Sequence, residues 1–118
     1  MKQNHMQSLL LENKPARGFS LIIPSPQMVE MVAYAGFDWV LIDMEHGTIG
    51  LENAELMIMA AEASGKTAIA KPGSNSPAVI ASIMDRGATG VQVPHVNTAE
   101  DAHAAVSAVK FGPRAGGR

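Results

Sequence analysis

Residues 36–47 read Gly36-Phe37-Asp38-Trp39-Val40-Leu41-Ile42-Asp43-Met44-Glu45-His46-Gly47. The apolar run 39–42 predicts a short buried strand, and Gly36 predicts the end of a preceding helix. Asp43, Glu45 and His46 follow that strand directly. Parallel α/β folds keep their chemistry at the carboxyl ends of strands, and a buried charge without a partner is costly. These three residues therefore indicate either a functional site or acids that cap the next helix beside a hydrogen-bonded loop histidine.

The same strand, loop and helix pattern recurs along the chain. A leading helix is expected over residues 5–14, ended by Pro15. The predicted strands are 18–23, 39–42, 67–71 and 90–94, and the helices that follow them begin at Ser25-Pro26, Leu51, Ser76-Pro77 and Thr98 and end near Gly36, Ser64, Gly87 and Lys110. Serine before proline is typical of a helix start, and Thr98 with Asp101 resembles a capping box. Four such units with short loops predict parallel strands joined by right-handed crossovers.

The number of units favours half of a barrel. A parallel (β/α)8 TIM barrel takes about 250 residues, and this chain has 118. We expect a leading helix or tail over 1–17, four βα units over 18–111, and a truncated glycine-rich loop over 112–118. An open four-stranded sheet is the alternative, and its first and fourth strands would then be apolar edges that need association or a continuation of the chain.

Composition excludes several classes of protein. The net charge is -2, and the nine lysines and arginines are scattered along the chain, so neither nucleic acid nor a membrane is an expected partner. With no cysteine there are no disulfides and no thiolate sites. The first residues lack the apolar core of a signal peptide, and no apolar run approaches membrane-spanning length. We expect a soluble cytoplasmic protein.

Three motifs in a fixed order resemble one family. They are the stretch 36–46, Ile83-Met84-Asp85-Arg86-Gly87-Ala88, and Val91-Gln92-Val93-Pro94-His95-Val96-Asn97-Thr98-Ala99-Glu100-Asp101-Ala102. Their order and spacing are similar to the N-terminal half of the HpcH/HpaI aldolase and citrate lyase family, in particular its metal-dependent aldolases of the 2-keto-3-deoxy acid and 4-hydroxy-2-oxo acid type. The resemblance implies a TIM barrel lyase that cleaves a 2-keto-4-hydroxy acid to pyruvate, or a related oxoacid, and an aldehyde.

The resemblance also implies a cofactor and partners. A divalent cation, Mg²⁺, Mn²⁺ or Co²⁺, would hold the carboxylate and keto oxygen of pyruvate and stabilise the enolate. The Glu and Asp that bind this cation in the family belong to later strands, so no metal ligand is expected within this chain. The expected partners are a small 2-oxo acid substrate and further copies of the chain in a homo-oligomer.

By the same resemblance, His46 is the base that removes a proton from the substrate hydroxyl, and Asp85 raises its basicity. The helical pattern places Asp85 at a helix end opposite the strand ends, which a different helix end or a neighbouring subunit would reconcile. Asp43 is expected beside His46, where it orients a metal-bound water. Lys71 stands where the family has an arginine that binds substrate and stabilises the enolate, and a lysine supplies the charge without the planar fork. The glycine-rich family loop is matched only loosely by 111–118.

Other polar residues have open assignments. Gln92, within an apolar strand, is expected either to point into the barrel and contact substrate or to make a structural hydrogen bond. His95 follows the fourth strand at the active end, whereas His5 and His103 are expected to face solvent. Two other functions remain open: a catalytically inactive half-barrel that self-associates, and a small module that binds an anion near His46 and His95. No phosphate-loop or Gly-x-Gly-x-x-Gly pattern supports the anion-binding module.

Overall fold

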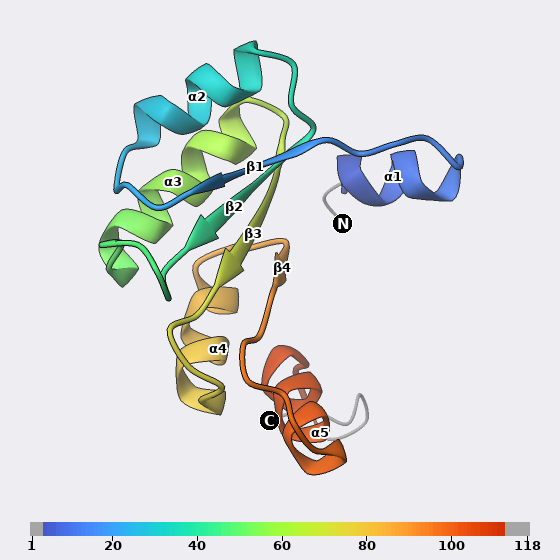
Figure 1. The fold of residues 1–118 in the computed structure, drawn as a ribbon, viewed down its shortest axis with the longest axis vertical. Coiled ribbons are helices and arrows are strands. Elements are labelled where there is room, and N and C mark those ends of the chain that lie inside the picture. The colour runs from blue at the N-terminus through green and yellow to red at the C-terminus, as the bar shows by residue number, and fades with distance from the viewer. Residues whose placement is uncertain (1–3, 113–118) are drawn as a thin grey trace.

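The computed structural model describes residues 4–112 and contains four strands and five helices within them (Figure 1). Along the chain these are α1 (His5–Leu11), β1 (Gly18–Leu21), α2 (Pro26–Tyr34), β2 (Trp39–Asp43), α3 (Leu51–Ala63), β3 (Thr67–Lys71), α4 (Pro77–Asp85), β4 (Gly90–Val91) and α5 (Ala99–Val109). Among the described residues, no helix is both long enough and apolar enough to cross a membrane.

The strands form one parallel sheet in the order β1-β2-β3-β4. Each connection between neighbouring strands contains a helix, as parallel pairing requires. Helix α2 packs against α3, and α4 packs against α5, so two helix pairs accompany the sheet (Figure 1). This arrangement confirms the predicted parallel α/β fold, and it leaves β1 and β4 as the two edges.

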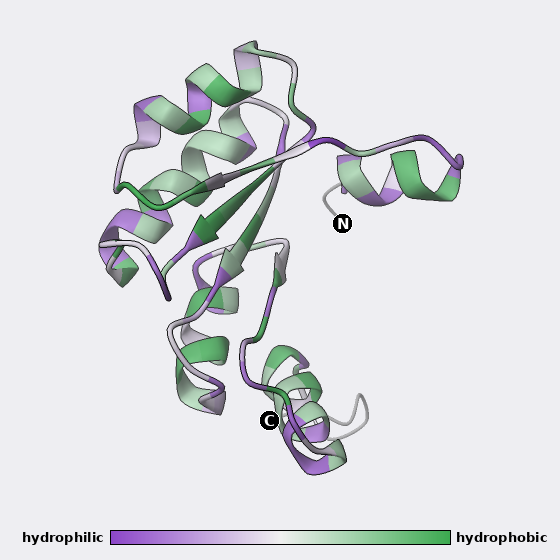
Figure 2. Cartoon of the chain, in the orientation of Figure 1, coloured by the Kyte–Doolittle hydropathy of each residue, from purple (hydrophilic) through white to green (hydrophobic). Residues whose placement is uncertain are grey.

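The core lies between the sheet and the helices. Strand side chains alternate between the two faces, and on β2 the residues Val40 and Ile42 are buried against the helices. Figure 2 shows β2 as one of the most hydrophobic segments of the chain. The other fully buried members of this main cluster are Val29, Ala54, Met57, Ala61, Ala70 and Ile83. A smaller cluster joins Ile80 of α4 to α5.

The register fixes what lies on the other face of the sheet. Asp43 is the register partner of Lys71, and both lie on the face opposite Ile42 and Ala70. The backbone N–H of Gln92 donates to the Ala70 carbonyl at 2.9 Å, which continues the ladder one residue past β4. Asp43, Lys71 and Gln92 therefore occupy one row across three neighbouring strands, at their carboxyl ends.

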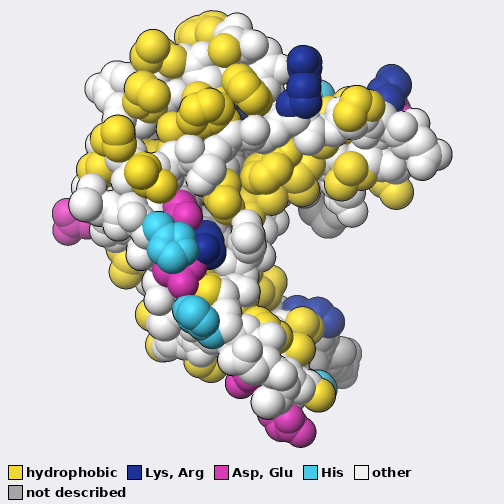
Figure 3. Space-filling model, viewed as in Figure 1, with side chains coloured by type: hydrophobic (Ala, Val, Ile, Leu, Met, Phe, Trp, Pro, Cys, Tyr) yellow, Lys and Arg dark blue, Asp and Glu magenta, His cyan; other side chains and the backbone are white. Residues whose placement is uncertain are grey.

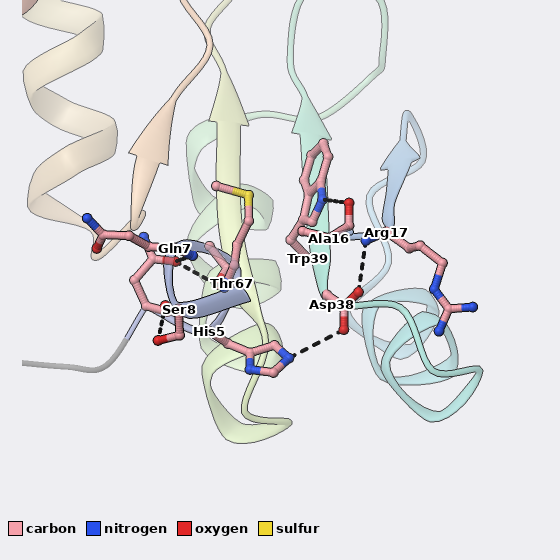
Figure 4. A network of polar contacts seen from close by, with 10 residues as sticks. His5, Gln7, Ser8, Ala16, Arg17, Asp38, Trp39 and Thr67 are labelled. Carbon is pink, nitrogen blue, oxygen red and sulfur yellow. Dashed lines mark hydrogen bonds and ion pairs between the residues drawn. The ribbon is translucent and has the colours of Figure 1, made fainter. Parts of the chain in front are cut away.

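Helix α1 closes the amino end of the sheet through the network in Figure 4. The backbone N–H of Met6 donates to Thr67 Oγ1 at 3.1 Å, and His5 Nε2 lies 3.3 Å from Asp38 Oδ1. The Arg17 backbone N–H donates to Asp38 at 2.8 Å, and this bond, followed by the His5 contacts, lowers the pKa of Asp38 below its usual value. The side chain of His5, which the sequence predicts to face solvent, is 43% exposed, and its ring also pairs with the Asp38 carboxylate.

Several predicted boundaries differ from those observed. Strand β1 ends at Leu21 rather than 23. Its pairing with β2 stops there, and the Ile22 carbonyl accepts instead from the backbone N–H of Thr48, in the loop after β2, at 3.1 Å. Strand β4 has two residues where five were predicted, and Pro94 has no N–H with which to extend a ladder. Met31 of α2 is exposed. Apart from Gly112, the predicted loop 112–118 lies outside the described residues.

Candidate functional site

Polar side chains from three neighbouring units meet at the carboxyl ends of the strands. Glu45 lies at the centre. Its Oε2 pairs with the Lys71 ammonium and lies 3.3 Å from His46 Nε2, and its Oε1 lies 2.9 Å from His95 Nε2. The Lys71 Nζ is also 4.0 Å from Asp43 Oδ2. Figure 3 shows histidine, lysine and acidic side chains gathered in one place on the surface. We call these five residues the Glu45 cluster.

The turn after β2 positions Glu45 and His46. Asp43, the last residue of β2, is buried, and its Oδ1 accepts from the backbone N–H groups of Glu45 at 3.0 Å and of His46 at 2.9 Å. Aspartate favours such turns because its short side chain reaches the backbone two and three residues on. A Cβ on Gly47 would lie 2.4 Å from the Asp43 carbonyl oxygen and 2.6 Å from that of Ile22, so only glycine fits there.

The central ion pair is well shielded from solvent. The side chains of Lys71 and Glu45 are 15% and 14% exposed. The hydrogen bond from Lys71 lowers the pKa of the Glu45 carboxyl, and the same bond, followed by the charge of Asp43, raises the pKa of Lys71. Lys71 is therefore an ammonium ion and Glu45 a carboxylate at neutral pH, and the opposite charge of each stabilises the other.

The loop between β4 and α5 brings His95 to the cluster. His95 has φ 55°, a left-handed conformation that is uncommon for residues other than glycine. Its carbonyl accepts from Asn97 Nδ2 at 3.3 Å. Thr98 caps α5 in a capping box with Asp101, whose pKa is lowered mainly by the Asn97 backbone N–H. This confirms the predicted start of α5, and it fixes the base of the loop that carries His95.

Four of the residues proposed from sequence lie near one another. Asp43, His46 and Lys71 belong to the Glu45 cluster, and Gln92 is the next residue in the row beyond Lys71, with an exposed side chain. The structure does not bring Asp85 to them. It is the last residue of α4, which returns the chain to the amino ends of the strands before β4 begins.

The sequence does not reveal the part that two residues of the cluster, Glu45 and His95, play in it. The sequence groups Glu45 with Asp43 and His46 as site residues or helix-capping acids without showing that it is the centre of the site, and it leaves the role of His95 open. One signal in the sequence points to Glu45: a lysine ends the next strand, and a cation in that position needs a carboxylate of suitable reach. Asp43 is two residues earlier but uses one of its oxygens for the turn.

In the Glu45 cluster, the Lys71 ammonium and the imidazoles of His46 and His95 all contact the Glu45 carboxylate. The side chains of His46 and His95 are 67% and 71% exposed, so a solute can reach both rings. Within residues 4–112, no group of three or more His, Asp and Glu side chains is arranged to hold a metal ion. The described residues can bind an anion through Lys71 and move a proton through an imidazole, and these are the two capacities on which a function can be built.

Comparison with known proteins gives consistent matches. Residues 19–118 match the family model described as HpcH/HpaI aldolase/citrate lyase. The chain is 41% identical to the 2-dehydro-3,6-dideoxy-6-sulfogluconate aldolase of Pseudomonas putida, over 81% of this chain and 38% of that enzyme. It is 34% identical to the pyruvate aldolase of Rhizobium etli, over 93% of this chain and 43% of that enzyme.

A solved structure with a similar fold is that of the citrate synthase SbnG. It superposes with a TM-score of 0.88 at 32% identity, and the match covers 94% of this chain and 45% of that one. The chain thus spans less than half the length of these relatives.

Proposed function

The chain belongs to the HpcH/HpaI aldolase/citrate lyase family, and from that premise we propose that it supplies the base and the substrate-binding cation of an aldolase. The reaction is cleavage of a 2-keto-4-hydroxy acid to pyruvate, or a related oxoacid, and an aldehyde. One observation carries the proposal: His46, which follows β2, and Lys71, the last residue of the neighbouring strand β3, meet on the carboxylate of Glu45. The printed names of the relatives, a sulfogluconate aldolase and a pyruvate aldolase, support it.

Lys71 binds the acid end of the substrate in this proposal. Its ammonium has three N–H donors, and a carboxylate oxygen can accept one of them beside Glu45. As the bond between C3 and C4 breaks, its electron pair moves into the enolate of pyruvate, and a fixed positive charge nearby stabilises that enolate. In this proposal the side-chain amide of Gln92, whose backbone follows Lys71 in the row, donates to the same end of the substrate.

His46 removes the proton that starts the cleavage. Its exposed imidazole accepts the proton of the C4 hydroxyl, the C4 oxygen becomes the aldehyde carbonyl, and the enolate later takes a proton at C3 to become pyruvate. Histidine is the side chain that most often serves as a general base, which suits this transfer. Asp43 acts indirectly: its carboxylate accepts a hydrogen bond from the backbone N–H of His46 and so fixes the backbone position from which the imidazole extends.

A divalent cation, Mg²⁺, Mn²⁺ or Co²⁺, is part of the proposal but not of the steps above. When bound, it would supply Lewis-acid stabilisation of the enolate. Residues 4–112 do not fit such an ion by themselves, since they hold no arranged set of three donors. The ligands of the cation would have to come from outside these residues. A contact between Asp85 and His46 would require a neighbouring subunit. A homo-oligomer and a cytoplasmic location, the latter supported by the lack of cysteine, belong to the same proposal.

The test is pyruvate release from a panel of 4-hydroxy-2-oxo acids, measured with each of the three cations. The wild-type protein should release pyruvate, and His46→Ala should lose most of this activity while it still binds pyruvate. His103→Ala is the matched control, because this exposed histidine lies on α5, away from the cluster. Full cleavage by His46→Ala would remove His46 from the mechanism, and cleavage of no compound by the wild type would overturn the proposal.

A half-barrel that self-associates is a second candidate, and the sheet edges favour it. Edge strand β1 and the segment after it carry exposed Phe19, Ile22 and Ile23, and unpaired edges of this kind invite pairing with another chain. Reading the coding sequence past codon 118 separates the two candidates. Four further units with Glu and Asp at later strand ends would support the aldolase, and an immediate stop codon would favour the associating half-barrel.

A further inference from the structure

The hydrogen-bond donors of a lysine at position 71 are less fixed in direction than those of an arginine would be. An ammonium is a point charge on a flexible stem, and its donors rotate, whereas a guanidinium presents a rigid fork that matches a carboxylate. A lysine that must bind the acid end of a substrate therefore needs another group to fix its direction. In this protein the Lys71 side chain is 15% exposed and its Nζ lies between two carboxylates, those of Glu45 and Asp43.

The two carboxylates do not contribute equally. Glu45 is in direct contact with the Lys71 ammonium, whereas the nearest oxygen of Asp43 is 4.0 Å away. Asp43 also accepts two backbone N–H bonds through its other oxygen, so its first task is the turn. Glu45 is thus the group that sets the position of the Lys71 charge.

Glu45 is itself held from several sides. Its backbone N–H is bonded to Asp43, its Oε1 lies 2.9 Å from His95 Nε2, and its Oε2 lies 3.3 Å from His46 Nε2. These contacts come from the loops after β2 and β4, while Lys71 ends β3. A carboxylate restrained in this way offers the ammonium one fixed partner, and the donors of Lys71 that Glu45 does not use then point in defined directions.

We propose that Glu45 is a positioning residue: it orients the Lys71 ammonium so that a free N–H donor meets the carboxylate of a 2-oxo acid, and it thereby supplies the direction that a guanidinium would have had by its own geometry. This inference rests on the proposed function for the identity of the ligand. It assigns Glu45 a role through Lys71, and it does not make Glu45 a group that touches the reacting atoms.

A double-mutant cycle tests the inference with pyruvate, in the presence of Mg²⁺, as the probe. Glu45→Gln keeps the shape of the side chain and removes its charge, and Lys71→Arg supplies a cation with its own fork. We expect Glu45→Gln to raise the Kd for pyruvate about tenfold with Lys71 in place, and by less than about threefold in the Lys71→Arg background, since sites in contact couple while independent sites add. Glu30→Gln, on the exposed side of α2, controls for the loss of one negative charge and should leave the Kd unchanged.

Equal effects of Glu45→Gln in both backgrounds would overturn the inference, because Glu45 would then act without Lys71. A lower Kd in Glu45→Gln would also overturn it, because Glu45 would then compete with the ligand for Lys71. Since Glu45→Gln could also loosen the loop, the thermal midpoint of each variant is measured, and Glu45→Asp is included as a second variant. The aspartate keeps the charge with a shorter reach and should recover part of the affinity.

A second readout separates this inference from the proposed function. The ¹³C-dimethylated lysines of the 118-residue chain are titrated by NMR, and the Lys71 signal is identified by its loss in Lys71→Arg. Glu45→Gln should lower the titration midpoint of that signal and leave the other lysines unchanged. An unchanged midpoint overturns the inference even if the protein cleaves aldols. A shifted midpoint and a raised Kd, in a protein that cleaves no aldol, support the inference and count against the proposed reaction alone.

Discussion

Replacing Gly47 by alanine tests the geometry that brings the Glu45 cluster together. Gly47 follows His46, at the point where the loop after β2 passes against the end of β1. An added Cβ would lie 2.4 Å from the Asp43 carbonyl oxygen, 2.6 Å from the Ile22 carbonyl oxygen and 2.9 Å from the Ile22 Cα. All three are backbone atoms, so no side-chain rotation can make room.

The size of the effect follows from these distances. The two contacts are shorter, by about 0.9 Å and 0.7 Å, than the roughly 3.3 Å at which carbon and carbonyl oxygen ordinarily approach. Overpacking of this kind costs about 1–3 kcal/mol. The loop must also move, and the bond from Thr48 N–H to the Ile22 carbonyl is then lost, which adds about 1 kcal/mol. We expect Gly47→Ala to reduce the free energy of unfolding by about 2–4 kcal/mol.

Urea unfolding followed by far-UV circular dichroism measures this change. With a slope of about 1–3 kcal/mol/M, the midpoint should fall by at least about 0.7 M. Gly73→Ala is the control, because its Cβ would meet only the Met44 carbonyl oxygen, at 3.5 Å. That variant should be neutral or more stable by up to about 1 kcal/mol. A Gly47→Ala midpoint equal to that of Gly73→Ala would refute the close approach of the loop to β1.

Three further predictions concern the parts of the fold that support the site. Thr98→Ala removes the capping box of α5 and should cost about 1 kcal/mol in urea unfolding, with no loss if the cap is not formed. Ile80→Ala, at a fully buried position, should cost about 2–5 kcal/mol, whereas Leu11→Ala, at an exposed one, should stay within about 0.5 kcal/mol. The pKa of Asp38 is lowered in the fold, so its stabilising effect is complete above the ordinary value of 3.8 and is lost as the pH falls through the lower folded value. The unfolding midpoint of the wild type should therefore fall more steeply below about pH 4 than that of Asp38→Asn, and parallel curves would contradict the Asp38 network.

Much of the framework could be predicted because local signals and the packing agree. The strand Thr67–Lys71 was predicted with its observed bounds, and Ser25 accepts from the Met28 backbone N–H as a helix cap should. Short apolar runs bounded by Gly and Pro leave few alternatives to the buried parallel strands of an α/β fold. The ends of β1 and β4 were less predictable. They depend on the hydrogen bond from Thr48 to the Ile22 carbonyl, and on both strands being edges of the sheet that pair on one side.

The inner geometry of the site was harder to predict than its location. Sequence placed Asp43, His46 and Lys71 at strand ends, but the centre of the cluster depends on where Glu45 points. That direction follows from two backbone bonds to Asp43, which spacing does not reveal. The resemblance and the helical pattern disagreed on Asp85, and within the described residues the position of Asp85 follows the helical pattern.

Exchange of the pyruvate methyl protons tests the central claim most directly, because it requires no knowledge of the aldehyde. The protein is incubated with pyruvate in D₂O with Mg²⁺, Mn²⁺ or Co²⁺, and loss of the methyl signal is followed by ¹H NMR. If the strand-end cluster stabilises an enolate through Lys71, the wild type will catalyse exchange, and Lys71→Met will slow it at least about tenfold. Bound pyruvate that does not exchange, or exchange unaffected by Lys71→Met, would contradict the assignment of the cluster to enolate chemistry.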